Sequence, residues 1–308
     1  MVLQDALFDV TVNPVLRLRQ ICLLAYDLEW TSNLLCTAFD ATVVFRDSRM
    51  AAGGNLTNTH IRLGDSFLET VCPSDLAWQR STTQTRLLDR NGDCGYMAIV
   101  QVPDVGVASQ AMAKQGNAIG MVSGGLIVCP GSPGSGFADI ESRNYELGEP
   151  LPKKEGTVSG ANVQFHPRDF GTLAEIQENW PGQSEFPRNK GAYFPAGNTW
   201  QTDVDVRPHG GVTTGFAAVE IAPRDADPKD VCARWQQGLE AGCWIDPAQP
   251  TILHLADGQT MRFVKPGSDG RTGVIGVDLW SVAAKRKTFE TIDICGVTWR
   301  LVEPASGD

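Results

Sequence analysis

The chain has 308 residues, of which 42% are hydrophobic and 20% are charged. This length allows two domains, and this composition excludes an extensively disordered protein. The formal net charge of −10 argues against nucleic acid as a partner, because an acidic surface repels phosphate groups. The sequence has no signal-peptide pattern and no apolar run of about 18 residues, so we expect a cytoplasmic protein with no membrane partner.

The eight cysteines lie in apolar contexts. They form no CxxC pair and no Cys/His cluster with the spacing of a zinc site. We therefore interpret most of them as small buried side chains.

One pattern occurs four times along the chain: an apolar strand runs into an acidic or Pro-Asp break and then into a helix. The four segments are RQICLLAYDLEW (19–30), GYMAIVQVPDVGVASQAMAKQGN (95–117), GFAAVEIAPRDADPKDVCARW (215–235) and GVIGVDLWSVAAKRK (273–287).

Capping residues predict where the helices begin. Asp27, Asp104 and Asp227 can each accept a hydrogen bond from the first turn of a helix. Pro228 suits the first position of the third helix, where its missing N–H group has no cost. The fourth segment is expected to hold a weaker helix within 283–293, which lacks a clear apolar stripe.

Short strand candidates follow each helix, so each unit has the order β-α-β-β-β. We expect an α+β protein with an N-terminal extension (1–14), a first domain of two units (15–180) and a Gly/Pro-rich linker (181–211). A second domain (212–308) holds one full unit and one truncated unit.

The first unit opens with RQICLLAYDLE and closes with GDSFLETVCP, and the second closes with FHPRDFGTLAEI. These tandem units resemble the vicinal oxygen chelate superfamily, whose members are glyoxalase-like. The last segment is similar to the closing strand of methylmalonyl-CoA epimerase-type members, where a His-Pro-Lys-Asp turn precedes a strand with a metal-binding glutamate. The resemblance implies that paired modules form half-barrel cups.

The resemblance also implies four metal-ligand positions that face one another across the cup. In this chain they fall on Gln20, Glu69, Met97 and Glu175. The family usually has histidine at the first and third of these positions, so this chain departs from the pattern. A thioether is a poor ligand for hard divalent ions. Both a site with a divalent metal ion and a site without a cofactor therefore stay open.

A hairpin places one histidine near this set. If Gly64 and Asp65 form a two-residue turn, His60 lies opposite Glu69 and both point to the same face of the sheet. His60 could then complete a metal site with Glu69, Glu175 and Gln20. The other interpretations are a metal-free acid/base pair with Glu69, or an ion pair at the sheet edge without a catalytic role.

Three other side chains are candidates for contact with a substrate. The phenol of Tyr96 could donate a proton or bind a substrate oxygen. Gln20 and Met97 would line the cup, and His166 either lies at its rim or fixes the turn before the strand that carries Glu175.

The expected function is a proton shift beside a carbonyl or hydroxyl of a small-molecule substrate, catalysed by an isomerase, epimerase or lyase. Glu69, Glu175, His60 and Tyr96 are its catalytic candidates. The alternative is a metal-free protein that sequesters small molecules. An extradiol-type dioxygenase is disfavoured, because two histidines are missing from the expected positions. The C-terminal half has Arg262 and Arg300 at its closing positions, and we expect it to be structural or to form a lid and the surface of a homodimer.

Overall fold

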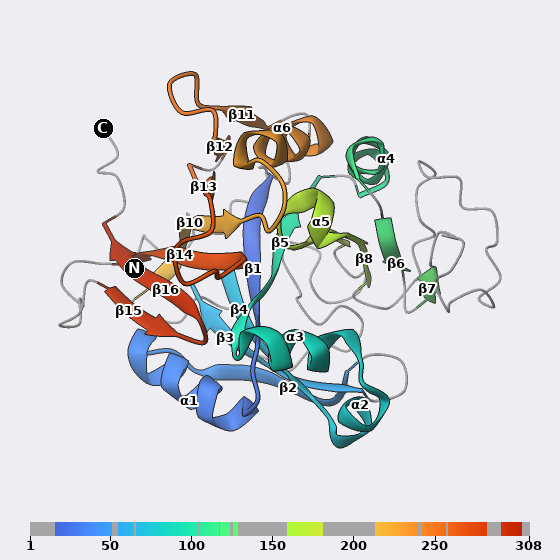
Figure 1. Cartoon of the computed structure of the whole chain (residues 1–308), viewed down its shortest axis with the longest axis vertical. Helices are drawn as coiled ribbons and strands as arrows, with labels where there is room; N and C mark the ends of the chain where they lie inside the picture. The colour runs from blue at the N-terminus through green and yellow to red at the C-terminus, as the bar shows by residue number, and fades with distance from the viewer. Residues whose placement is uncertain are drawn as a thin grey trace, which may run out of the picture.

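The fold is known from a computed structural model (Figure 1). The structure describes residues 16–50, 55–64, 66–103, 105–116, 118–123, 126–128, 159–180, 213–239, 242–256, 258–281 and 291–303.

The first half of the chain builds a nine-stranded sheet with the order β2-β3-β4-β1-β5-β9-β8-β6-β7. Its centre is the antiparallel pair β1 and β5, and each of these strands has a parallel neighbour, β4 or β9. The strands are β1 (Arg17–Leu24), β2 (Val43–Met50), β3 (Leu56–Leu63), β4 (Ser66–Pro73), β5 (Cys94–Gln101), β6 (Ala118–Ser123), β7 (Leu126–Val128), β8 (Ser159–Phe165) and β9 (Leu173–Trp180).

The second half builds a seven-stranded sheet with the order β11-β12-β13-β10-β14-β16-β15. It repeats the central arrangement of the first sheet, because β10 and β14 pair antiparallel and have parallel outer neighbours, β13 and β16. The strands are β10 (Thr213–Ala222), β11 (Cys243–Ile245), β12 (Ile252–Leu255), β13 (Thr260–Phe263), β14 (Gly273–Ser281), β15 (Thr291–Ile294) and β16 (Val297–Val302).

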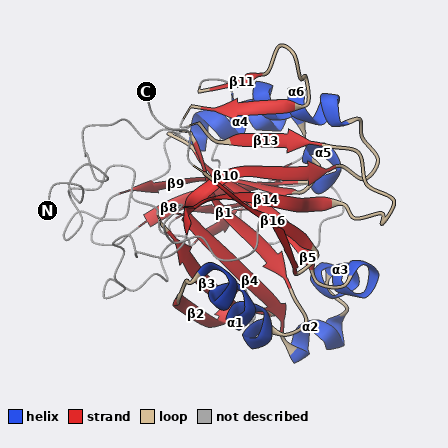
Figure 2. Cartoon of the chain, turned by 90° about the vertical axis from the view of Figure 1, so that its left-hand side faces the viewer, coloured by secondary structure: helices blue, strands red, loops and turns tan. Residues whose placement is uncertain are grey.

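Within the part of the chain that the structure describes, six helices connect these strands. Two groups of them lie at opposite ends of the molecule, with α1, α2 and α3 at one end and α4, α5 and α6 at the other (Figures 1 and 2). The helices are α1 (Leu28–Phe39), α2 (Asp75–Arg80), α3 (Thr83–Asn91), α4 (Val105–Gln115), α5 (Pro167–Phe170) and α6 (Pro228–Leu239).

The helix starts agree with the capping residues where these are described. Asp27 accepts a hydrogen bond from the Trp30 N–H group, and Asp227 accepts one from the Lys229 N–H group at 2.8 Å. Asp104 lies outside the described residues. The prediction of a weak helix within 283–293 is wrong for its last three residues. Residues 291–293 belong to β15, which pairs with β16. Residues 282–290 lie outside the described part.

The two sheets share one hydrophobic core. It combines side chains of both sheets and of the helices that cover them, including the fully buried Ile21 of β1, Trp235 of α6 and Trp299 of β16. Close backbone contact joins the sheets at Gly95, where a Cβ atom would lie 2.1 Å from the carbonyl oxygen of Val274. The buried residues of the first sheet also include polar side chains, among them Gln20, His60 and Glu69.

The predicted α+β class with repeated βαβββ-like modules is confirmed. The first and third units show this order, and the second adds the strand β7 and the helix α5 to it. The linker 181–211 lies outside the described residues, so its role as a domain boundary stays a prediction. None of the described helices has the length and apolar character needed to span a membrane. The cytoplasmic location and the homodimer stay predictions.

Candidate active site

The hairpin of β3 and β4 has the predicted register. Leu63 lies opposite Ser66, and three pairs further along His60 lies opposite Glu69. The turn uses Gly64 with a positive φ of 60°, which glycine adopts without strain; Asp65 lies outside the described residues. His60 and Glu69 are 1% and 5% exposed, and the Nε2 and Oε1 atoms are 3.8 Å apart.

Three side chains donate hydrogen bonds to the carboxylate of Glu69. The Nε2 atom of Gln20 and the Sγ atom of Cys22 lie 2.7 Å and 2.6 Å from Oε2. The Nδ2 atom of Asn58 lies 2.5 Å from Oε1. These donors come from β1 and from β3, the two strands beside β4. Three donors from two strands therefore converge on one buried carboxylate.

Glu175 on β9 is the second buried acid of this face, with 4% of its surface exposed. The Nε2 atom of Gln164 donates a hydrogen bond to its Oε2 atom at 2.8 Å. Burial raises the pKa of Glu175 to about 7, while hydrogen bonds from Gln164 and Asn162 act to lower it. The negative charge of Glu69 raises this pKa further, so the two acids are close enough to interact.

Met97 and Tyr96 lie between these acids on β5. The register of β1 and β5 shifts so that Cys22 pairs with Met97 and Leu23 pairs with Gly95, which leaves Tyr96 as the extra residue of a bulge. Burial raises the pKa of Tyr96 to about 12, and the charges of Glu69 and Glu175 add to this effect. The phenol therefore keeps its proton at neutral pH.

We call the side chains that meet at these two acids the polar face. They come from both units of the first sheet: Gln20, Cys22, Asn58, His60, Glu69, Tyr96, Met97, Asn162, Gln164 and Glu175.

Strand pairing shows that the two units contribute equivalent positions to the polar face. Cys22 pairs with Glu69 across β1 and β4, and Ile99 pairs with Glu175 across β5 and β9. The strands β1 and β5 run antiparallel, so a local two-fold axis between them exchanges the two units. Gln20 pairs with Ile99, and Cys22 pairs with Met97. Gln20 and Met97 are thus equivalent, as are Cys22 and Ile99.

The hairpins of the two units obey the same two-fold relationship. His60 lies opposite Glu69, and Gln164 lies opposite Glu175. Two residues before them on the same face are asparagines, Asn58 in β3 and Asn162 in β8. The placement of the four ligand positions implied by the family resemblance is therefore consistent with the strand register.

His166 is not brought to the polar face. It caps α5, and its Nδ1 atom accepts a hydrogen bond from the backbone N–H group of Arg168 at 3.0 Å. This helix packs against β9 and α6, and its Phe170 belongs to the shared core. Of the two interpretations of this histidine, the contacts support the one in which it fixes the turn before β9.

Four residues of the polar face were missed by sequence reasoning: Cys22, Asn58, Asn162 and Gln164. Cys22 is buried, as was expected of most cysteines, but its thiol also contacts Glu69. Side chains alternate between the two faces of a strand, and this alternation could have identified two of the four residues. Cys22 follows Gln20 by two residues and Asn58 precedes His60 by two, so each pair shares a face.

The second sheet carries an ion cluster at its equivalent positions. Arg262 pairs with Glu220 across β13 and β10, and Arg300 pairs with Asp278 across β16 and β14. The NH1 atoms of both arginines lie 2.7 Å and 2.8 Å from the carboxylate oxygens of Asp278. The Nε atom of Arg262 and the NH2 atom of Arg300 each lie 3.5 Å from a carboxylate oxygen of Glu220. We call these four residues the ion quartet; its arginines are bound by carboxylates of the same sheet.

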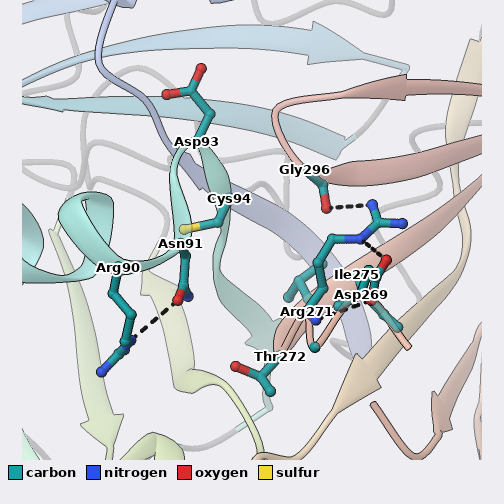
Figure 3. A pocket seen from close by; sticks show the side chains of 11 residues that line it. Arg90, Asn91, Asp93, Cys94, Asp269, Arg271, Thr272, Ile275 and Gly296 are labelled. Carbon is teal, nitrogen blue, oxygen red and sulfur yellow. Dashed lines mark hydrogen bonds and ion pairs between the residues drawn. The ribbon is translucent and has the colours of Figure 1, made fainter. Parts of the chain in front are cut away.

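A separate cavity of about 160 Å³ lies where the two sheets meet (Figure 3). It lies between the end of α3, the start of β5 and the turn that joins β15 to β16. The charged group of Arg271 is held by its neighbours, because Nε lies 2.6 Å from Asp269 and NH1 lies 3.1 Å from the carbonyl oxygen of Gly296. None of the predicted site residues lines this cavity.

No protein-family model matches the sequence, and no curated protein does. Among solved structures, a hypothetical protein from Staphylococcus aureus is similar over 94% of this chain and 100% of its own, with a TM-score of 0.56 and 10% identity. The methylmalonyl-CoA epimerase of Mycobacterium tuberculosis matches over 53% of this chain and 88% of its own, with a TM-score of 0.36 and 15% identity.

A Streptomyces coelicolor methylmalonyl-CoA epimerase in complex with 2-nitronate-propionyl-CoA matches over 53% of this chain and 97% of its own, with a TM-score of 0.36 and 14% identity. At these identities the likeness concerns the fold alone.

Proposed function

We propose that the protein catalyses proton transfer at a carbon beside a carbonyl or hydroxyl of a small molecule, as an isomerase, epimerase or lyase. The observation that carries this proposal is the pair of buried carboxylates, Glu69 and Glu175, on the closing strands of two related units. Two acids that reach one site from different strands can remove a proton and return one.

The environment of Glu175 supports a role in acid/base catalysis. An acid transfers protons best when its pKa lies near the working pH, and burial raises the pKa of Glu175 to about 7. At neutral pH both its protonated and its charged forms are then populated. A surface carboxylate would be almost entirely charged.

In the proposed reaction one carboxylate takes the proton as the C–H bond breaks, and the electron pair moves into the neighbouring C=O bond to give an enolate. Protonation by the second acid completes an epimerisation or isomerisation, whereas loss of a β-substituent completes elimination. Tyr96 can stabilise the developing charge. Its oxygen accepts a hydrogen bond from Gln84 at 3.0 Å, which leaves its own proton for a substrate oxygen.

The residues present do not fit the divalent metal that the family resemblance implies. The amide nitrogen of Gln20 faces Glu69, and an N–H group offers no lone pair to a metal. The thioether of Met97 is a poor partner for hard ions. Among the residues that the structure describes, no three His, Cys, Asp or Glu side chains cluster as metal ligands. We therefore assign Glu69 and Glu175 to proton transfer and His60 to support of Glu69.

The test is hydrogen–deuterium exchange at carbon, measured by NMR in D₂O with a panel of 2-oxo acids, 2-hydroxy acids and acyl thioesters. Exchange should fall by about 10²-fold or more in Glu69→Gln and Glu175→Gln. Glu29→Gln, at an exposed ion pair of α1, serves as the control and should exchange normally. Hydrogen–deuterium exchange at carbon should also continue after metal ions have been removed by exhaustive chelation.

Two results would overturn the proposal. Exchange that stops on chelation and returns with a divalent ion would assign the carboxylates to a metal site. Absence of exchange with every probe, together with tight binding of a probe that neither glutamine variant weakens, would favour the alternative of a protein that sequesters small molecules. The substitution of Met97 for the family histidine is the observation that favours this second function.

A further inference from the structure

Two arginines lie on the same face of the first sheet as the two acids of the polar face. Arg19 belongs to β1 and Arg62 to β3, and these residues are only 4% and 6% exposed. A guanidinium group keeps its charge in proteins. Two permanent positive charges are therefore buried on this face together with the acids.

Strand alternation and a ring contact define the direction of Arg62. Its neighbour Ile61 belongs to the hydrophobic core, so Arg62 points to the other face, as His60 does. Arg62 lies opposite Phe67 in the hairpin, and its Cζ atom is 5.8 Å from the centre of the Phe67 ring. Its Nε atom donates a hydrogen bond to the carbonyl oxygen of Gly64 at 2.8 Å. These contacts hold the guanidinium group in place, two residues along β3 from His60.

A β-bulge directs Arg19 to the same face. The register of β1 and β5 shifts between Leu18 and Gln20, which leaves Arg19 as the extra residue. Its Nε atom donates a hydrogen bond to the Oε1 atom of Gln101 at 2.8 Å. Val100 belongs to the hydrophobic core, so its neighbour Gln101 points to the other face of β5. The side chain of Arg19 therefore reaches the polar face.

The local two-fold makes Arg19 the counterpart of Tyr96. Each is the extra residue of a bulge, and each directly precedes an opening-strand ligand position, Gln20 or Met97. The two bulges flank the paired segment that holds these positions, one at each end. Bulges are common beside active sites, where they redirect a side chain. Because Tyr96 is proposed to contact a substrate oxygen, Arg19 is placed to contact a different part of the same substrate.

The arginines can offset the charge of the acids toward an anionic substrate. The hydrogen bonds to Glu69 and Glu175 come from amides and a thiol, and not from these arginines. Buried acids repel a substrate with a negative charge, whereas guanidinium groups bind carboxylates and phosphates through charge-assisted hydrogen bonds. Residues two apart on a strand are separated by about 7 Å. An anion held at the arginines therefore leaves room for a carbonyl or hydroxyl group at the acids.

We propose that Arg19 and Arg62 bind an oxyanion group of the substrate, a carboxylate or a phosphate, while the reacting C–H group lies beside the two acids of the polar face. We call Arg19, Arg62 and Gln101 the anion end of this face. The substrate is then a small oxo or hydroxy compound with a negative charge, and neutral carbonyl compounds are poor substrates. This inference rests on the proposed proton-transfer function and names its substrate class.

Binding of paired probes tests the anion end without turnover. By calorimetry, levulinate (4-oxopentanoate) is compared with 4-oxopentanamide, which has nearly the same shape but no charge. Dihydroxyacetone phosphate is compared with dihydroxyacetone in the same way. The wild type should bind at least one anion about 10-fold or more tightly than its neutral partner, and the larger preference identifies the group as carboxylate or phosphate. Equal affinities within both pairs would overturn the proposal.

Glutamine variants assign the preference to the anion end. Arg19→Gln and Arg62→Gln should each weaken binding of the preferred anion by about 10-fold or more, with no change for the neutral partner. Arg46→Gln is the control, because it removes the same charge from an exposed ion pair with Glu29, and it should bind both probes normally. An equal loss for both members of a pair would mean that the arginines only shape the site. An equal loss in the control would assign the effect to net charge, and either result would contradict the proposal.

Lysine variants keep the test valid if a glutamine variant fails to fold. Arg19→Lys and Arg62→Lys retain the charge but lose the fork of donors, so they should keep a smaller preference for the anion. If both lysine variants fold and bind the anion no better than its neutral partner, charge is not what the site recognises and the proposal fails. In the carbon-exchange assay, the glutamine variants should raise KM for the preferred anion with kcat little changed, because the oxyanion is bound equally before and during proton transfer.

The two proposals can fail separately. Calorimetry needs no turnover, so it tests the anion end even if no probe exchanges its hydrogen. If binding depends on the arginines but Glu69→Gln and Glu175→Gln leave carbon exchange unchanged, the proton-transfer function is wrong and the anion site stands. If carbon exchange depends on both acids but neither probe pair shows a preference for the anion, the function stands and the assigned substrate class is wrong.

Discussion

Nε2 of Gln164 lies 2.8 Å from Oε2 of Glu175, its cross-strand partner in β8 and β9. In the other unit His60 is the cross-strand partner of Glu69. The polar face therefore has one acid opposite an amide and one opposite an imidazole. This difference leads to predictions for the pH dependence of stability and for the role of His60.

The first prediction concerns the pH dependence of stability. The pKa of Glu175 is raised from its ordinary range to about 7, mainly by burial, so the folded state binds this proton more tightly than the unfolded state does. The stabilisation is complete below the unfolded pKa and is lost as pH rises through about 7. Glu175→Gln should remove this loss, which is on the order of 2–3 kcal/mol.

Urea unfolding at a series of pH values measures this effect. The wild type and Glu29→Gln should lose stability between acidic and mildly basic pH, while Glu175→Gln should follow a flatter curve. If the curves of the wild type and Glu175→Gln stay parallel, the pKa of Glu175 is the same in the folded and unfolded states, and its assignment to proton transfer loses support.

The second prediction separates two roles for His60. Gln164 is its counterpart, so His60→Gln copies a side chain that already serves an acid in this fold. If His60 only supports Glu69, carbon exchange should fall by less than about 10-fold. If His60 carries a proton, the loss should reach about 10²-fold and the pH profile should lose a limb.

His60→Ala completes the comparison. It removes a ring that is 5.5 Å, centroid to centroid, from that of Phe45 and opens a space in a buried face. We expect a loss of stability in this variant whichever role is correct, measured as a lower Tm. Activity should therefore be compared between the wild type and His60→Gln at temperatures where both are folded.

The repeated modules and the His60–Glu69 pair could be predicted from the sequence for a physical reason. A two-residue turn leaves one register for a hairpin, so the predicted turn at Gly64 and Asp65 placed His60 opposite Glu69. The donors to the acids were harder to predict. Gln20 and Cys22 reach Glu69 across a parallel pair, β1 and β4, and no short turn specifies the register of strands so far apart in the chain.

Two other differences have local causes. The short helices α2 and α3 were not predicted, because they begin at ordinary capping residues, Ser74 and Thr82, and lack a long apolar stripe. The residues after Glu290 were expected to continue a helix, but they pair as β15 with β16. Pairing with a neighbouring strand outweighed a weak local preference for helix.

A third prediction concerns the contact between the two sheets. A Cβ atom on Gly95 would lie 2.1 Å from the backbone oxygen of Val274, so Gly95→Ala requires the start of β5 and of β14 to separate. We expect destabilisation of about 2 kcal/mol or more. Gly267→Ala is the control, because its Cβ atom would meet only a flexible side-chain oxygen, of Asp269, at 3.3 Å. Equal Tm values for the two variants would show that the sheets do not approach this closely.

The last prediction concerns the ion quartet. Its two arginines occupy in the second sheet the positions that hold Glu69 and Glu175 in the first. Burial acts to raise the pKa of Asp278, but hydrogen bonds and charges from Arg262 and Arg300 outweigh it and lower this pKa. The stabilisation from Asp278 is therefore present above its unfolded pKa and is lost as pH falls through the folded value.

Asp278→Asn should destabilise the protein by about 1–3 kcal/mol, because two neighbouring arginines lose their shared carboxylate. Arg300→Gln together with Asp278→Asn removes one charge of each sign, and it should cost less than the sum of the two single variants. Urea unfolding of the four proteins measures this coupling. Strict additivity would mean that Arg300 and Asp278 do not stabilise each other.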